Sequence, residues 1–494
     1  MEPHVLLLSF SSQAHIAACF RMGEALSCRG VTVTFVTLSK YIAQIRKLYT
    51  DEQLEKQRIN LVGLDGVERG NIFEKAEDLK LSFKPYFEEL LRNQKAGKPG
   101  PTCVMADRFL FWTKDVAMEL QIGWYLFFSN GSIEARLHQY SQKLYSEGSL
   151  RISEGTIVGM DNVSKAPGLE FLRAEDLPWS RWAYPEETKK VGEFMVGADG
   201  LVLNTFEELE RSVVNSLREN LASGSHRDAL VFTIGPLSSE CNFSVKSEQS
   251  DGLSTSPKQA HISFLDQLED DGQKCVNWLN QQPPSSVLYV CFGTVFSLEQ
   301  RQIEALAVAL EDSQERFVWV LRRDSTDAED VLPPNYETRI GDRGLVLGGW
   351  VPQPQLLTHP SIWGFLSHCG WSSCLDSVKA GVPVLAWPQG ADQHANARLL
   401  ESVWKTAILI TQKKGDAMFH QVAADVTGKE LDMFVDHDEL EAGIRLLMRG
   451  QEGRDARERA IDLRRKANAA VDGSDGSSVV SLQRLVDHIQ TLRA

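Results

Sequence analysis

Long apolar runs and an excess of basic residues are both missing from this sequence. No apolar stretch in the 494 residues approaches the length of about 20 that a membrane-spanning helix needs. Lys and Arg number 52 against 67 Asp and Glu, which gives a formal net charge of −15. This charge argues against binding to nucleic acid or to anionic membranes. A ligand that carries phosphates would therefore need to be held by something other than bulk positive charge.

Cysteine patterns and targeting signals are also lacking. The eight cysteines include no CxxC pair, and Cys369 and Cys374 are five residues apart. Neither a zinc site nor a disulfide framework is indicated, which favours a reducing compartment. The N-terminus, MEPHVLLLSF, has no basic region and no cleavage site of a signal peptide. We therefore expect a cytoplasmic protein that is independent of metal and acts as a monomer.

The length of the chain predicts two domains, because 494 residues are too many for one core. Residues 238–271 are rich in Ser, Asp, Gln and Glu and read as an interdomain linker. We predict a first domain over residues 1–237 and a second over 272–475. Residues 476–494 are expected to form a C-terminal helix that packs back on the first domain.

Both halves alternate short apolar strands with amphipathic helices. Val5–Phe10 and Val31–Leu38 read as strands on either side of a helical pattern over Ile16–Cys28. In the second half, Ile362–Leu366 and Val382–Trp387 read as strands around a helix that Gly381 ends. The predicted fold class is α/β, with a mostly parallel sheet in each domain.

Two polar residues follow predicted strands of the first half. His15 comes after Val5–Phe10, and Asp107 ends the strand Cys103–Ala106. Ligands bind at the carboxyl ends of strands in open α/β sheets, so both are candidate site residues. Taken alone, His15 could be a polar residue at a helix start, and Asp107 could be an N-cap, a role compatible with chemistry.

A less regular region, residues 150–195, carries scattered aromatic residues. They either line a hydrophobic pocket or anchor loops and core, the commoner role for such residues: Trp179, Trp182, Tyr184 and Phe194.

The stretch Trp350–Gln393 resembles the 44-residue signature of plant family-1 UDP-dependent glycosyltransferases. It contains W-V-P-Q at its start, H-C-G-W in its middle, G-V-P-V near its second strand and D-Q at its end. Further similarity is found in other parts of the chain, namely Gln13–His15, Ala198–Glu210, Val290–Thr294 and Gly476–Ser478. The resemblance implies a GT-B fold, in which two Rossmann-like domains face each other across a cleft.

The resemblance also implies how a UDP-sugar is held. Trp350 would stack on uracil, an interaction worth about 1–3 kcal/mol, and the alternative of a core Trp is weak inside this motif. The Val351 backbone would read the uracil edge, while Gln353 and Asp376 would contact the ribose. The start of the helix after H-C-G-W offers free N–H groups and a favourable dipole to the diphosphate. The residues assigned to the diphosphate are His368, Trp371, Ser372, Ser373 and Thr294, and those assigned to the sugar are Asp392, Gln393 and, from the first domain, Ser129.

Catalysis is assigned by the same resemblance to the first domain. His15 would be the general base that activates an acceptor hydroxyl, and Asp107 would orient and stabilise its imidazole. Direct displacement would invert the anomeric centre and release UDP. The acceptor, a small lipophilic molecule such as a flavonoid or another phenolic, would meet Phe109, Trp112, Trp179 and Trp182.

Three positions depart from the family pattern. Ala14 replaces the usual Gly, Ser372 the usual Asn, and Asp376 the usual Glu, so the ribose contact would need a small backbone shift or a bridging water. Gln393 at the end of the signature favours glucose over galactose as the donor sugar.

Two other classes of function compete with a glycosyltransferase. One is a reductase or a nucleotide-sugar epimerase, but the first turn reads SSQAH rather than GxGxxG. The other is a non-catalytic UDP-sugar-binding protein, against which the presence of both His15 and Asp107 argues.

Overall fold

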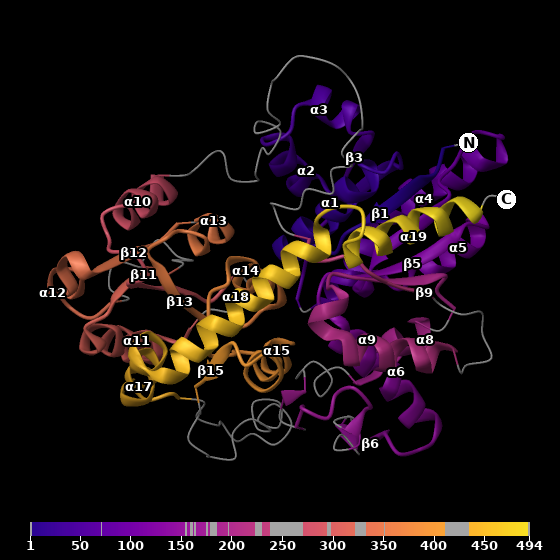
Figure 1. Ribbon diagram of the computed structural model, residues 1–494. Helices are drawn as coiled ribbons and strands as arrows, with labels where there is room; N and C mark the ends of the chain where they lie inside the picture. The colour runs from indigo at the N-terminus through magenta and orange to yellow at the C-terminus, as the bar shows by residue number, and fades with distance from the viewer. Residues whose placement is uncertain are drawn as a thin grey trace.

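Two parallel β-sheets organise the molecule (Figure 1). The computed structural model describes residues 2–70, 72–153, 156–158, 162, 165–173, 176–177, 185–195, 197–222, 230–237, 270–293, 298–321, 332–349, 351–410 and 434–492. The first sheet has seven strands in the order β3-β2-β1-β4-β5-β8-β9, and the second has six in the order β12-β11-β10-β13-β14-β15. Every pairing within these two sheets is parallel. The expected pair of α/β domains is confirmed.

The strands are short, and the inner ones are buried on both faces, as is typical of parallel sheets, whereas the strands β3, β12 and β15 are partly exposed. In the first sheet they are β1 His4–Leu8, β2 Thr32–Leu38, β3 Ile59–Leu64, β4 Cys103–Asp107, β5 Gly123–Phe128, β8 Gly200–Leu203 and β9 Leu230–Thr233. In the second they are β10 Val287–Cys291, β11 Arg316–Val320, β12 Gly344–Leu347, β13 Ile362–Ser367, β14 Val384–Ala386 and β15 Ala407–Leu409. A separate antiparallel pair joins β6 Arg151–Ser153 to β7 Thr156–Val158.

Helices cover both faces of the sheets. The first domain contributes α1 Gln13–Ser27, α2 Ser39–Arg46, α3 Asp51–Lys56, α4 Ile72–Lys95, α5 Thr113–Leu120, α6 Ser132–Ser146, α8 Pro185–Met195 and α9 Glu207–Ala222. The second contributes α10 Asp270–Leu279, α11 Gln300–Ser313, α12 Tyr336–Ile340, α13 Gln353–Leu357, α14 Trp371–Ala380, α15 Gln393–Arg398 and α17 His437–Arg449. No described helix combines the length and the apolar composition that crossing a membrane requires.

The order of strands creates a crevice in each sheet. β1 pairs with both β2 and β4, and β10 pairs with both β11 and β13, so the strand order reverses at these positions. Ligands of open α/β sheets bind outside the carboxyl ends of strands at such switch points. His15 and Asp107 follow or end the first pair, while Gly293 and His368 follow the second.

The last two helices connect the domains. α18 Gln451–Val471 contacts α14 and α17 of the second domain and α9 of the first, and α19 Ser477–Thr491 packs on α1 and β9 (Figure 1). The sequence pattern predicts no element over 451–471, because α18 is strongly polar and faces the core largely through alanines such as Ala467 and Ala470. The sequence predicts a C-terminal helix within residues 476–494, and α19 lies there.

The sequence pattern predicts one helix over Phe109–Leu120 and another over Ala395–Val403, and the structure divides each of them. Phe109–Leu120 divides into the 3-10 turn η1, Arg108–Leu110, and α5. Ala395–Val403 divides into α15 and the π-helix η6, Leu399–Trp404. The predicted linker over 238–271 lies almost wholly outside the described residues, and α10 begins at Asp270, inside its predicted end.

Candidate active site between the two sheets

His15 and Asp107 are in direct contact. His15 lies in the first turn of α1 and Asp107 is the last residue of β4, so the pairing of β1 with β4 brings them together. The distance from His15 Nδ1 to Asp107 Oδ2 is 2.7 Å. The Asp107 side chain is fully buried, while 17% of the His15 side chain is exposed. Since Nδ1 is engaged by the carboxylate, Nε2 is the nitrogen left to exchange a proton with a ligand.

The second oxygen of Asp107 holds the backbone. Oδ1 accepts a hydrogen bond from the Phe109 N–H at 3.1 Å, so Asp107 also caps the turn η1. Both readings of Asp107, cap and partner of His15, therefore coexist in the structure. The carboxylate is fixed from two sides, which fixes the imidazole ring in turn.

The surroundings of His15 are aromatic on one side and polar on the other. The rings of Phe10 and Phe109 lie 5.4 and 5.6 Å from the imidazole, centroid to centroid. The Ser129 hydroxyl, at the end of β5, lies 3.1 Å from Nδ1. An apolar wall beside a candidate base suits a lipophilic acceptor.

The predicted acceptor-pocket residues do not all meet at this site. Phe109 does, but Trp112 is only 4% exposed and packs in the core against Phe83 and Phe87 of α4. The prediction for Trp112 is wrong because α4 covers its ring. Trp179, Trp182 and Tyr184 lie outside the described residues, and Phe194 stacks on Phe111 at 4.9 Å.

The turn after β13 prepares the start of α14. Cys369 has a left-handed backbone, with φ of 63°, and Gly370 precedes the helix without a side-chain cap. The N–H groups of the first turn, from Trp371 to Ser373, therefore remain available to an anion. Ser372 is exposed at this helix start, whereas Ser373 is buried.

His368 is enclosed at the same turn. A Cβ added to Gly293 or to Gly370 would lie 2.6 Å from His368 Nε2, so only glycine fits on either side of the ring. Burial lowers the pKa of His368 to about 4, which keeps the imidazole neutral near pH 7. Among the described residues, its buried Nδ1 has no hydrogen-bond partner. A neutral imidazole of this kind can donate one hydrogen bond to a phosphate oxygen.

The residues assigned to the ribose contact one another. Gln353 Nε2 donates to Ser373 Oγ at 3.0 Å and to Asp376 Oδ2 at 2.9 Å. Val351 is buried in the core cluster around α14. Trp350 and Thr294 lie outside the described residues.

The sugar-side residues at the end of the signature differ in how they are held. Asp392 Oδ2 accepts from Asn396 Nδ2 at 3.0 Å and from Asn130 Nδ2, across the cleft, at 3.4 Å. Burial raises the pKa of Asp392, and the charge of Glu134 raises it further. Gln393 Oε1 instead accepts from the backbone N–H groups of Gln389 and Gly390, so its carbonyl oxygen holds a turn.

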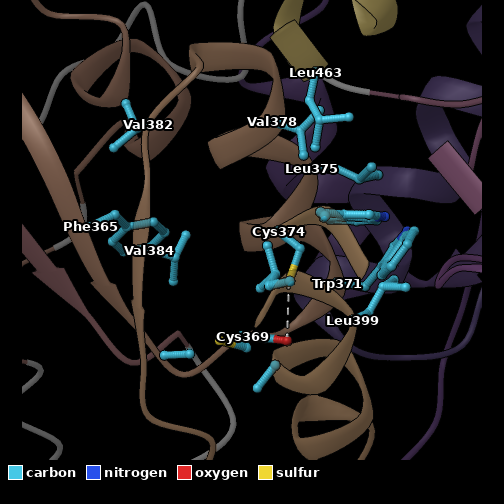
Figure 2. Close-up of a cluster of buried hydrophobic side chains, with 14 of the residues drawn as sticks. Phe365, Cys369, Trp371, Cys374, Leu375, Val378, Val382, Val384, Leu399 and Leu463 are labelled. Carbon is cyan, nitrogen blue, oxygen red and sulfur yellow. Dashed lines mark hydrogen bonds between the residues drawn. The ribbon is translucent and has the colours of Figure 1, made fainter. Parts of the chain in front are cut away.

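Trp371 lies at the domain interface. Its indole N–H donates to the carbonyl oxygen of Asn204 in the first domain at 2.8 Å, and the side chain is 4% exposed. Figure 2 shows Trp371 near Leu375 and Leu399, away from Phe365 and Val384 of the second sheet. Its side chain therefore cannot contact the diphosphate, and its possible contribution to the donor is its backbone N–H.

Asn130 and Asn204 were not anticipated as site residues. Asn130 stands directly beside Ser129 in the sequence, and this adjacency was the signal available for Asn130.

Elsewhere in the described part of the chain, Asp436, His437 and Asp438 form a group that could hold a metal ion, at the start of α17.

Known UDP-sugar transferases are similar to this chain in sequence. The family model for UDP-glucoronosyl and UDP-glucosyl transferase matches residues 261–420. A 7-deoxyloganetin glucosyltransferase from Gardenia jasminoides is 27% identical over 98% of this chain and 97% of its own. A flavonol 3-O-glucosyltransferase from Arabidopsis thaliana is 29% identical over 99% of this chain and 97% of its own.

A solved structure gives the same result for the fold. A crystal structure of a UGT from Siraitia grosvenorii in complex with UDP superposes with a TM-score of 0.77 at 25% identity, covering 99% of this chain and all of that one. Over nearly its whole length the chain is similar to plant UDP-glycosyltransferases. This glycosyltransferase has the predicted GT-B fold, and the comparisons give no support to a reductase or an epimerase.

Proposed function

We propose that this glycosyltransferase transfers glucose from UDP-glucose to a hydroxyl group of a flavonoid or another small phenolic, with inversion at the anomeric carbon. One observation carries the proposal. The consecutive residues Ser129 and Asn130 contact His15 and Asp392, respectively. The candidate base and the candidate sugar-binding carboxylate therefore lie on two sides of one turn, close enough to act on one substrate pair.

His15 acts as the general base in this mechanism. Nε2 takes the proton of the acceptor hydroxyl as its oxygen attacks the anomeric carbon, and the bond from that carbon to the diphosphate oxygen breaks. Asp107 stabilises the imidazolium ion through Nδ1 without taking the proton itself. General-base catalysis of this kind contributes about 10²–10⁴ in rate.

The departing UDP carries the negative charge that the reaction releases. The uncapped N–H groups of α14 and its dipole stabilise that charge, with His368, Ser372, Ser373 and Thr294 as further donors. This arrangement answers the question raised by the acidic composition, because a helix start and neutral donors bind a diphosphate without a basic patch.

The remaining donor residues determine which nucleotide and which sugar bind. Trp350 stacks on uracil and the Val351 backbone reads its edge, while Gln353 and Asp376 hold the ribose. Gln353 bridges Ser373 and Asp376, so the shorter acidic side chain is held in place by the amide. Asp392 and Gln393 bind the sugar hydroxyls, and Gln393 favours glucose.

The acceptor meets His15, whose side chain is 17% exposed, and the ring of Phe109 beside it, while the buried Phe10 supports the imidazole from behind. Stacking on these rings favours a flat phenolic. The names of the relatives support this class, since one is a flavonol glucosyltransferase, while the 7-deoxyloganetin enzyme indicates that terpenoid-like acceptors belong in any screen.

The test is a UDP-release screen of several UDP-sugars against phenolic and terpenoid acceptors, with the wild type and His15→Ala side by side. We expect turnover with UDP-glucose and a phenolic, and a loss of about 10²–10⁴ in kcat in the variant. A different preferred sugar or acceptor would overturn that part of the proposal. Undiminished turnover by His15→Ala would show that another group is the base.

A further inference from the structure

The segment Asn204–Glu210, here called the bridging segment, has no part in the mechanism so far. It begins directly after β8 and enters α9, where Glu210 has a non-helical backbone with φ of −127°. Its sequence, NTFEELE, lies within the stretch Ala198–Glu210 that resembles the glycosyltransferase family. Its position between the domains indicates a further role.

Two tryptophans of the second domain bind this segment. Trp371 donates its indole N–H to the Asn204 carbonyl at 2.8 Å, and Trp404 donates its own to the Leu209 carbonyl at 3.0 Å. The two indole rings lie 6.1 Å apart, and both side chains are buried. The second domain thus fixes the positions of two backbone carbonyls of the first domain relative to the start of α14.

The bridging segment also holds the Ser129–Ser132 turn at the end of β5. Asn204 Nδ2 donates to the Ser129 carbonyl at 3.1 Å, and the Glu210 carboxylate accepts from the Ser132 N–H at 3.0 and 3.2 Å. Gly131 leaves no spare room, because a Cβ there would lie 2.5 Å from the Trp371 ring and 2.7 Å from Glu210. The turn is therefore held between the bridging segment and Trp371.

These contacts form one continuous chain across the domain boundary. It runs from Trp371 to Asn204, from Asn204 to Ser129, and from the Ser129 hydroxyl to His15 Nδ1. Asn204 is 1% exposed, and its Oδ1 accepts from the Leu237 N–H at 2.8 Å. Both ends of its amide are thus engaged, which fixes its orientation.

We propose that Asn204 is a positioning residue, which sets His15 relative to the diphosphate-binding start of α14 through Ser129, with Trp371 as its anchor in the second domain. The inference rests on the proposed function, because it takes His15 to be the base. Small misplacement of a catalytic group lowers the rate of the chemical step more than it weakens substrate binding. A defect in this chain should therefore reduce kcat and leave KM for the donor nearly unchanged.

The first test replaces Asn204 by a side chain of the same shape. Asn204→Asp keeps an acceptor for the Leu237 N–H and removes the donor to the Ser129 carbonyl. We expect kcat with UDP-glucose and the best acceptor of the screen to fall about tenfold, and KM for UDP-glucose to stay within about twofold. An unchanged kcat in the folded variant would overturn the proposal.

The second test compares two matched tryptophan variants. Trp371→Phe and Trp404→Phe each remove one indole N–H bond to the bridging segment, but the Leu209 carbonyl belongs to no described bond with the Ser129–Ser132 turn. We expect a loss in kcat of about threefold to tenfold for Trp371→Phe and of less than about twofold for Trp404→Phe. If the two variants lose kcat equally, or if the loss in kcat only follows the fall in Tm, Trp371 has a structural role and the proposal is wrong.

A double-mutant cycle separates this proposal from the assignment of the base. If Asn204 and Trp371 act through the Ser129 hydroxyl, combining Trp371→Phe with Ser129→Ala should cost no more than the larger single loss. Additive losses would overturn the positioning role while leaving His15 as the base. This cycle also decides the matter if Asn204→Asp does not fold. Conversely, full activity of His15→Ala would overturn the proposed base whatever the cycle gives.

Discussion

The two histidines at the switch points of the two sheets occupy similar places in the fold and have opposite environments. His15 lies beside a buried carboxylate at 2.7 Å and keeps part of its ring exposed. His368 is enclosed between Gly293 and Gly370, and burial lowers its pKa to about 4. The position after a parallel strand brings an imidazole to the cleft, but the neighbour decides its chemistry. The contact with a carboxylate suits His15 to the proposed role of a base, and burial suits the neutral His368 ring to the proposed role of a hydrogen-bond donor.

The largest expected effect comes from removing the negative charge of Asp107, the carboxylate in contact with His15. In Asp107→Asn, the single amide oxygen cannot accept from both the Phe109 N–H and His15 Nδ1. Either the turn loses its cap or the imidazole is held in the wrong tautomer, and the imidazolium loses its counter-charge. We expect kcat to fall about 10²–10⁴, with little change in KM for UDP-glucose, in steady-state assays. A loss below about tenfold would show that the carboxylate is only a cap.

The second prediction concerns His368 and acid stability. Its folded-state pKa, about 4, lies below the ordinary value of 6.5, so the unfolded chain binds the proton more tightly. Stability is therefore present above pH 6.5 and is lost as the pH falls toward 4. Denaturant unfolding of the ligand-free protein at pH 7 and pH 4.5 should show a loss smaller by about 2 kcal/mol in His368→Gln than in the wild type.

An equal loss in His368→Gln and the wild type would contradict the enclosure of the His368 ring.

The third prediction tests the glycines that enclose His368. Gly370 has φ of −60°, which any residue adopts, so Gly370→Ala adds only a Cβ, 2.6 Å from His368 Nε2. The ring must move away from the start of α14, and we expect KM for UDP-glucose to rise about tenfold with a smaller change in kcat. The control is Gly100→Ala, whose added Cβ meets open space, and it should leave KM for UDP-glucose unchanged. Gly97 has a positive φ, so an alanine there would be strained and would not serve. Unaltered donor affinity in Gly370→Ala would argue that His368 does not bind the diphosphate.

The smallest expected effect concerns a departure from the family pattern. Ser372 is exposed at the start of α14, where the family usually carries Asn. The longer amide of Ser372→Asn adds a donor beside the diphosphate, so we expect KM for UDP-glucose to fall about threefold. Ser402→Asn, elsewhere in the second domain, serves as the matched substitution. A rise in KM would show that the serine is adapted to a different donor geometry.

Much of the fold and the pairing of His15 with Asp107 could be predicted from the sequence. The strand–helix rhythm places His15 and Asp107 at strand ends, and the parallel pairing of β1 with β4 brings them into contact. Each of these steps depends on local pattern and a general rule of α/β sheets. The bounds of η1 and α5 were less predictable, because the 3-10 turn depends on the cap from Asp107.

The directions of individual side chains could not be predicted. Trp371 belongs to the signature, yet its indole partner, Asn204, is 167 residues away in the sequence. Trp112 is covered by α4, and Gln393 holds a turn with its carbonyl oxygen. These choices depend on packing between distant elements, which no local pattern encodes. The sequence pattern does not predict α18, because small alanines rather than large apolar residues form its buried face.

The C-terminal helix α19 has a consequence for how the protein is made. Its residues Val479, Leu482 and Ile489 belong to the same core cluster as Val5 and Phe35, near the other end of the chain. Tyr125 of β5 also bonds to His488 at 2.6 Å. On the ribosome, the apolar face of the first sheet that α19 covers stays open until α19 itself has emerged. Synthesis of the second domain therefore proceeds beside an unfinished first domain, and nascent chains that stop short of α19 should be the ones that chaperones retain.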